Sequence, residues 1–433
     1  MKLKIISLAA FLFCLAGISG AQAQEKLSLE QAIAKALENN YQIRVGELNT
    51  EIAKNNNDWG TVGAYPNIDL GATNVNRYDD NNQGESTTHS VAPYVSMNYN
   101  IFNGFSARIS KTRLEELERL SEGNTRLVIE NTLQALVLSY YRALLAKEQL
   151  EVLRDVKNLS RDRYDYEQTR RELGNAISFE VLQAKTAYLS DSSNFILQKN
   201  NYHNALRNLN QLMAVEVGQE YELSGDLTPS YQKYNVENLE EMMLSDNRNL
   251  KNQYINNKLQ QANIELEKSA LYPSFRLNSG VDYSRTRINS DGAPSASTND
   301  SYAYYANFSL SFNLFNGGNT RRAIQNAEIE KDIAEIETEE LENDLRRSLQ
   351  NAFELYEVRK QLFDVAVENE EAAKLNMQIA EDRFKAGAIN SFNYRDIQLA
   401  YLNTSLNKLQ TVYDLIDSQT DLMRLTGNIV SEY

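Results

Sequence analysis

Cysteine, histidine and proline are scarce in this sequence. Its 433 residues include one cysteine, two histidines and five prolines. One cysteine excludes a disulfide framework, and two histidines far apart in the chain, His89 and His203, argue against a histidine-based metal site or catalytic dyad. No glycine-rich phosphate loop or nucleophile motif occurs either. An enzyme is therefore the weakest interpretation, and no cofactor and no metal are predicted.

Basic residues and long apolar runs are also in short supply. The chain has 44 Lys and Arg against 59 Asp and Glu, a net charge of −15, which argues against nucleic acid as a partner. Residues 1–23 combine Lys2 and Lys4 with an apolar run and Ala21-Gln22-Ala23. This pattern predicts a secretory signal peptide that contains Cys14. No later segment supplies the ~20 apolar residues of a membrane-spanning helix.

Two stretches alternate between apolar and polar residues with the period of a β-strand, residues 91–101 and 301–315. The apolar face of the second stretch consists of Tyr302, Tyr304, Ala306, Phe308, Leu310, Phe312 and Leu314. The opposite faces of the two stretches carry Asn98, Asn100, Asn307, Ser309, Ser311 and Asn313. Earlier strands are expected to pair with them, a short one after Tyr65-Pro66 and another at about 274–286. The polar residues 78–89 between the first two strands are expected to form a tip in water.

A glycine-containing joint follows each alternating stretch, at Asn103-Gly104 and at Asn316-Gly317-Gly318. Proline-free stretches come next, which predict helices over about 106–172 and 319–385, each roughly 100 Å long. The first contains a coiled-coil-like seam of Ile129, Leu133, Leu136, Tyr140, Ala143 and Leu150. Gly174 and Gly387 are expected to turn the chain into return helices that start near 178 and 391.

Matching motifs recur at a constant separation, which indicates an internal duplication. Phe102 and Phe315 are 213 residues apart, as are Gly174 and Gly387. We therefore predict a first repeat at 24–213, with a strand hairpin at about 66–103 and a helical hairpin at 105–213. A linker at 214–235 precedes a second repeat at 236–427, with hairpins at about 273–316 and 319–427, and a tail at 428–433. The fold class is an α+β membrane protein.

Four strands with one apolar face predict a β-barrel that one protomer cannot close. An open strand edge in lipid leaves backbone groups unpaired at several kcal/mol each. A dimer would give eight strands, with a lumen filled by side chains, whereas a trimer would give twelve and leave room for a pore. The polar strand face suits a wet lumen, so a homotrimer with a 12-stranded barrel in outer-membrane lipid is predicted.

The duplicated order of helix, strand hairpin, FNGF or FNGG joint, long helix, glycine turn and return helix resembles the TolC family of outer-membrane efflux ducts. The resemblance covers essentially the whole chain after residue 23. It implies a trimeric barrel in the outer membrane of a Gram-negative bacterium, continued by a helical barrel in the periplasm. It also implies a periplasmic adaptor protein and an inner-membrane pump as partners.

The resemblance places a pore gate at the far end of the helices. The family has a carboxylate six residues after the first turn glycine, matched by Glu180, and two carboxylates six and nine residues after the second. Asn393 replaces the first of these two, and Asp396 matches the other. For Asp396 the alternative is a solvated helix charge. Glu180 is expected to hold neighbouring hairpins together.

The two turns are also the expected adaptor contact, through the residues Gly174, Ala176, Ile177, Gly387, Ala388 and Ile389. In the family, a tyrosine and an arginine beside the second turn tie the closed tip together. Phe384 and Ile389 stand at these positions. The latch is therefore absent or built differently in this chain.

The sequence thus favours a passive exit duct that carries small toxic compounds from the periplasm to the exterior. Type I protein secretion and a non-pore periplasmic coiled-coil protein are the alternatives. Four strands with an apolar face argue against the second alternative. Neither the cargo nor the class of adaptor and pump is encoded in a recognisable motif.

Overall fold

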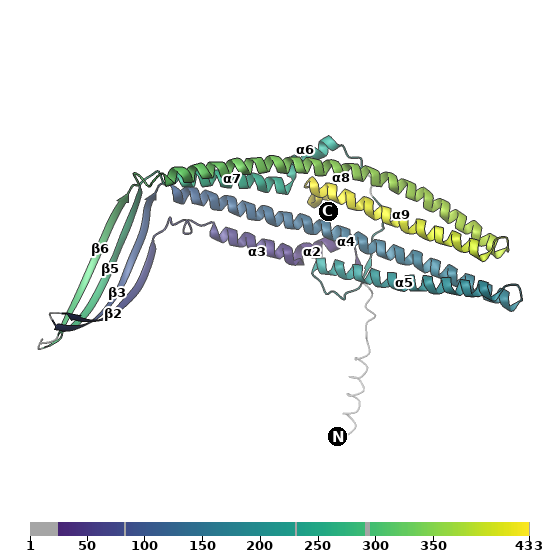
Figure 1. Cartoon of the computed structure of the whole chain (residues 1–433), viewed down its shortest axis with the longest axis horizontal. Helices are drawn as coiled ribbons and strands as arrows, with labels where there is room; N and C mark the ends of the chain where they lie inside the picture. The colour runs from purple at the N-terminus through teal and green to yellow at the C-terminus, as the bar shows by residue number, and fades with distance from the viewer. Residues whose placement is uncertain (1–24, 82–83, 230–231, 291–294, 433) are drawn as a thin grey trace, which may run out of the picture. The chain divides into compact units, whose positions relative to one another are not determined.

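The computed structural model describes residues 25–81, 84–229, 232–290 and 295–432 (Figure 1). The predicted signal peptide lies outside these residues. The described residues form two compact units. The strand unit contains residues 45–127 and 248–344, and the helical unit contains residues 25–44, 128–247 and 345–432. Each unit draws on both sequence repeats, whose limits stay a prediction.

Four antiparallel strands form the sheet of the strand unit, in the order β2-β3-β5-β6 (Figure 1). Their bounds are β2 Asn67–Asn81, β3 Gly84–Asn103, β5 Ser274–Ser290 and β6 Ser297–Ser311. The helices of this unit are α3 (Tyr41–Asn56), α7 (Arg248–Ser269) and the first parts of α4 (Ser106–Glu172) and α8 (Asn319–Lys385). The sheet therefore joins the strand hairpins of both repeats, as the predicted fold class requires.

The predicted alternation of faces is confirmed by the register of the strands. Leu277 pairs with Phe308, and Phe275 with Leu310, so the apolar side chains share one face. Asn98 pairs with Asn278 on the other face. Large apolar side chains are exposed on the first face, where 72% of Leu310 is accessible to solvent. One face of the sheet is therefore apolar and uncovered within the protomer.

Two predictions about the strands were wrong. The first strand is not short, because β2 has 15 residues and pairs with β3 as far as Asn81 opposite Gly84. Most of the predicted polar tip is thus strand, since ladder hydrogen bonds use the backbone and do not require apolar side chains. The last strand ends at Ser311, which pairs with Ser274, the first residue of β5. Phe312 and Leu314 therefore lie beyond the sheet.

The core of the helical unit surrounds the predicted seam of α4. Leu136, Tyr140 and Ala143 are fully buried, and the Tyr140 hydroxyl donates to the Leu27 carbonyl oxygen at 3.0 Å. A short parallel pairing of β1 (Glu25–Leu27) with β4 (Tyr221–Leu223) adds Leu27 and Tyr221 to this core. The other elements of the unit are α2 (Leu29–Asn39), α5 (Ser178–Met213), α6 (Val236–Asp246), α9 (Ser391–Leu425) and α10 (Ile429–Glu432).

The duplication is visible in one repeated hydrogen bond. Asn40 ends α2, and its side-chain amide donates to the Leu212 carbonyl oxygen near the end of α5 at 2.8 Å. Asn247 ends α6 in the same way and donates to the Leu425 carbonyl oxygen at the end of α9 at 2.9 Å. Each asparagine thus satisfies a carbonyl that a helix end leaves without an intrahelical partner.

The predicted long helices are confirmed. Helices α4 and α8 have 67 residues each, so each is roughly 100 Å long. Helix α9 ends two residues before Gly427, earlier than predicted. Gly427 has φ +72°, and a Cβ there would lie 2.7 Å from the Asp246 carbonyl oxygen. In the part of the chain that the structure describes, no helix is both long and apolar enough to span a bilayer.

Candidate functional site at the helical turns

The two turns between the long and return helices have the same backbone structure. After α4 the Asn175 amide donates to the Arg170 carbonyl oxygen, and the Gly174 amide to that of Arg171, at 2.8 and 3.0 Å. After α8 the amides of Ala388 and Gly387 make the equivalent two bonds at 2.8 and 2.9 Å. This pattern ends a helix with a left-handed residue, and both glycines have positive φ. The repeated sequence spacing therefore gives repeated turn geometry.

The helices that follow the turns are capped differently. The Asn390 side-chain oxygen accepts from the Asn393 amide at 2.8 Å at the start of α9. At the start of α5 the Glu180 carboxylate accepts from the Ile177 amide at 3.3 Å. A carboxylate in the first turn also suits the partial positive charge of a helix N-terminus. Glu180 thus has a local structural role in the protomer.

The predicted gate residues lie on the return helices close to the turns. Asp396 and Asn393 are both exposed on α9, three residues and so about one helical turn apart, whereas Glu180 on α5 is half-buried. The exposed positions leave Asp396 and Asn393 available to a lumen or to another chain. Their role as a gate stays a prediction, as does that of Glu180.

The apolar turn residues predicted to contact an adaptor differ in exposure. Ile177 is 64% exposed, and Ala388 is exposed as well. Ala176 is half-buried, and Ile389 packs against a cluster of apolar side chains of the helical unit. Gly174 and Gly387 are exposed, with open space where a side chain would begin. Among the predicted contact residues, Ile177 and Ala388 are therefore the two whose apolar side chains are exposed to a partner.

An aromatic cluster lies beside the second turn, where the family has the tyrosine of its latch and this chain has Phe384. Phe384 is buried and stacks on Tyr394, with ring centroids 4.5 Å apart and planes 5° from parallel. Tyr166 of α4 meets Phe384 edge-on at 5.1 Å. Burial raises the pKa of Tyr394 to about 12. Phe384 thus joins α4, α8 and α9 by packing, and it offers no hydroxyl for a hydrogen-bonded latch.

A buried ion pair joins the two helical hairpins. Arg395 of α9 donates to both carboxylate oxygens of Asp191 of α5, at 2.6 and 2.8 Å. The Asp191 side chain is 3% exposed and that of Arg395 is 16% exposed. The Ser160 hydroxyl of α4 donates to Asp191 and accepts from Arg395 at 3.1 Å. Three helices therefore meet at one charge-assisted, nearly dry contact.

A second buried cation lies beside this ion pair. Arg163 of α4 is 2% exposed, and its Nε donates to the Ser391 hydroxyl at 2.9 Å. Burial, and then the nearby Arg395, lower the pKa of Arg163, while Glu167 and Asp191 act in the opposite direction. Sequence reasoning missed this network. A signal was available, because polar residues occupy the positions spaced three and four apart that continue the core of α4, namely Ser160, Arg163 and Glu167.

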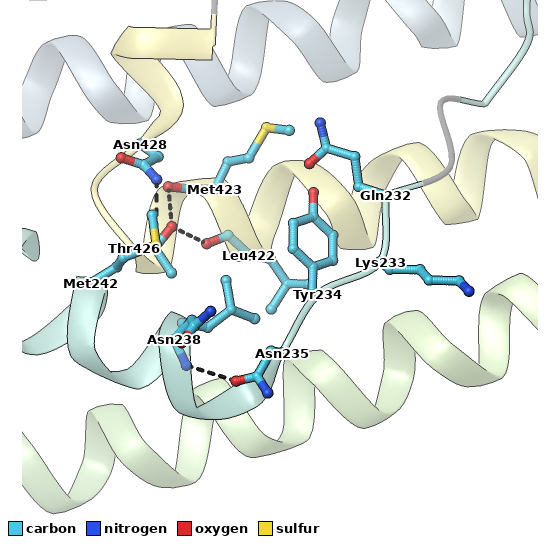
Figure 2. A pocket seen from close by; sticks show the side chains of 11 residues that line it. Gln232, Lys233, Tyr234, Asn235, Asn238, Met242, Leu422, Met423, Thr426 and Asn428 are labelled. Atoms are coloured by element: carbon cyan, nitrogen blue, oxygen red, sulfur yellow. Dashed lines mark hydrogen bonds between the residues drawn. The ribbon is translucent and has the colours of Figure 1, made fainter.

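A pocket of about 260 Å³ lies elsewhere in the helical unit, between α6, its preceding segment and the end of α9 (Figure 2). The Asn235 side chain accepts from the Asn238 amide at 2.9 Å and caps α6. The Thr426 hydroxyl donates to the Leu422 carbonyl oxygen at 2.9 Å. Both contacts serve helix ends, which supports a structural role for this pocket. No group of three potential metal-ligating side chains occurs among the described residues.

A protein-family model described as "Outer membrane efflux protein" matches residues 32–215 and 239–428. The chain belongs to this outer membrane efflux protein family. It is accordingly the outer-membrane channel component of an efflux system and not an enzyme, and its helical part lies in the periplasm. No curated protein sequence matches the chain.

Solved structures of outer-membrane proteins share the fold of this efflux protein. The CmeC channel of Campylobacter jejuni is 16% identical, with 92% of this chain and 85% of that chain covered and a TM-score of 0.73. The open-state MtrE channel of Neisseria gonorrhoeae is 15% identical, with 93% and 89% covered and a TM-score of 0.72. VceC of Vibrio cholerae is 12% identical, with 92% and 96% covered and a TM-score of 0.72.

Proposed function

We propose that three copies of this efflux protein form one continuous duct across the outer membrane and into the periplasm. The duct receives small toxic compounds from an inner-membrane pump through a periplasmic adaptor and releases them outside the cell. The unpaired edges of the sheet are the observation that carries the proposal. In the protomer, β2 and β6 each pair on one side only within the described sheet. In lipid, such edges must pair with further strands.

Uncovered apolar seams on the helices support the same assembly. Helix α8 carries four exposed apolar residues at the spacing three-four-three of a coiled-coil seam, Leu355, Val358, Leu362 and Val365. Helix α5 exposes Leu182, Leu189 and Ile196, seven residues apart. A protomer that leaves such seams in water loses the free energy of burying them, about 25 cal/mol per Å². Neighbouring copies of the chain would cover both seams.

The gate of the duct is proposed at the helical turns. With threefold symmetry, each exposed Asp396 becomes one of three carboxylates around the pore, and such a ring favours cations. Asn393, one helical turn earlier, would add an uncharged ring. Glu180 would act on the gate indirectly, because it caps the helix that carries the first turn. Phe384 and its stacked partner Tyr394 would keep the second turn rigid without a hydroxyl latch.

The adaptor contact is proposed at the exposed apolar residues of the turns. The test is drug resistance in a strain whose own copy of the gene is deleted and replaced by variants. The double substitution Ile177→Glu and Ala388→Glu should abolish resistance, because two charges per chain would have to be desolvated at the interface. Val217→Glu, at an exposed apolar position outside the turns, is the matched control and should retain resistance.

Assembly must be measured on the same variants. Trimer recovery should be unchanged in the double variant and in the control. Full resistance of a correctly assembled double variant would remove the turns from the adaptor contact. Loss of resistance in the Val217→Glu control as well would show that added charge, and not its position, is responsible.

A further inference from the structure

Four asparagines lie in a single row across the sheet. Asn67 of β2 pairs with Asn98 of β3, Asn98 pairs with Asn278 of β5, and Asn278 pairs with Asn307 of β6. All four share the polar face, since each strand contributes one member at the same register level. We call this set the asparagine row. Its members come from both repeats, so the row exists only because the two hairpins join.

The row has few side-chain partners. The Asn278 amide donates to the Asn98 oxygen at 2.8 Å, and the Asn67 amide donates to Asp69 at 3.2 Å. Asn67, Asn98 and Asn307 are exposed, and Asn278 is half-buried. A carboxamide has two donor hydrogens and an acceptor oxygen with two lone pairs. Most donors and acceptors of the row are therefore available to water or to a solute beside the polar face of the sheet.

The neighbouring levels of the same face carry charge. One level nearer the helices, Arg276 donates to the Asn100 side chain at 3.0 Å. One level further away lies Asp69, which pairs with Ser96. The row is thus an uncharged level between a guanidinium on one side and a carboxylate on the other. A solute that moves along this face would exchange contacts with one sign of charge for contacts with the other across the row.

Barrel geometry determines the shape that the row takes in the proposed duct. Three strand spacings of ~4.8 Å make an arc ~14 Å long. Strands in a barrel tilt by ~40°, so the arc rises about 9 Å along the barrel axis. Three copies would give three tilted arcs and not one flat ring.

We propose that the asparagine row lines the lumen of the duct as a hydrogen-bonding path for polar solutes of either charge, an inference that rests on the proposed trimeric channel. Carboxamide oxygens replace part of the water shell of cations, and carboxamide hydrogens do so for anions and for neutral hydroxyl or amide groups. The outer part of the duct therefore does not select by charge.

The test uses charged thiol reagents on planar bilayers. Cys14 is the only cysteine of the sequence, so an introduced cysteine is the only thiol after that position. Asn307→Cys places it in the row, and Phe308→Cys places it on the next residue of the same strand, on the apolar face. Anionic and cationic methanethiosulfonates applied to Asn307→Cys should move the cation/anion permeability ratio in opposite directions, each by at least about twofold. Phe308→Cys should not respond.

The outcomes separate the row from the channel itself. A parent protein that does not conduct contradicts the proposed function. A conducting parent whose Asn307→Cys variant keeps its permeability ratio after modification by both reagents, with modification verified by mass, overturns the assignment of the row alone. Asn98→Leu gives a second test, because a row that only fastens strands together would lower the melting temperature without changing the conductance. The path we infer requires a reduced conductance for hydrated ions in this variant.

Discussion

The buried pair of Asp191 and Arg395 should determine how firmly the two helical hairpins of a protomer hold together. Arg395→Gln removes the charged partner and leaves a carboxylate whose side chain is 3% exposed. Breaking a buried pair in this way costs about 3–5 kcal/mol. The lower end of this range is expected, because the substitution also removes the repulsion between Arg395 and the buried Arg163.

An exposed pair with the same contact distance provides the control. Arg154 and Glu151 are also 2.6 Å apart, but their side chains are 46% and 47% exposed. Exposed pairs contribute about 0–1 kcal/mol. Arg154→Gln should therefore have little effect, although the shortest contact that it removes has the same length. The two variants separate the contribution of burial from that of distance.

Native-state hydrogen exchange measures the local opening of the helices on which these residues lie. A cost of about 3–5 kcal/mol corresponds to exchange faster by roughly 150-fold to 5,000-fold in the peptides around Asp191 and Arg395. The double variant Asp191→Leu and Arg395→Met should restore most of the protection, because it leaves no uncompensated charge. Equal acceleration in Arg395→Gln and Arg154→Gln would refute the reasoning from burial.

Three further predictions concern other positions. Gly317→Ala should lower the free energy of unfolding by about 1–2 kcal/mol, because φ is +68° and the space around the glycine is open. Gly104→Ala should reduce the yield of folded protein far more, since its Cβ would lie 2.2 Å from the Ser269 carbonyl oxygen. Equal yields of the two variants would contradict this. Asp396→Asn should weaken cation preference in planar bilayers at neutral pH without loss of assembly, and an unchanged ratio would leave Asp396 as a solvated helix charge. The parent should lose about 2–3 kcal/mol of its free energy of unfolding between pH 10 and 12, and Tyr394→Phe should abolish this loss. Denaturant unfolding across this pH range measures both. The unfolded phenol ionises near pH 10 while the buried one stays protonated to about 12, so identical pH profiles would contradict this account.

The long helices were predictable because residues close in sequence determine where they begin and end. The absence of proline fixes their extent, and glycines with positive φ fix their ends, so α4 and α8 begin and end as predicted. The strand ends were not predictable in this way. Residues 78–81 are polar but still pair, because the partner strand and not the side-chain pattern decides where a ladder stops.

The buried network illustrates why the candidate site was only partly predictable. Asp191 and Arg395 are far apart in sequence, and only the packing of α4, α5 and α9 brings them to 2.6 Å. The turns, in contrast, followed from Gly174 and Gly387 alone. The proposed roles of Asp396 and Ile177 depend on other chains, because an exposed side chain of a protomer acquires its function from what it faces in the assembly.

The number of protomers in the detergent-solubilised protein tests the central claim most directly. Native mass spectrometry of protein extracted from outer membranes should give the mass of three chains, since three sheets of four strands leave no edge and enclose a lumen. A stable monomer recovered from the soluble periplasmic fraction, or a dimer whose eight strands would fill their own lumen, would contradict the account.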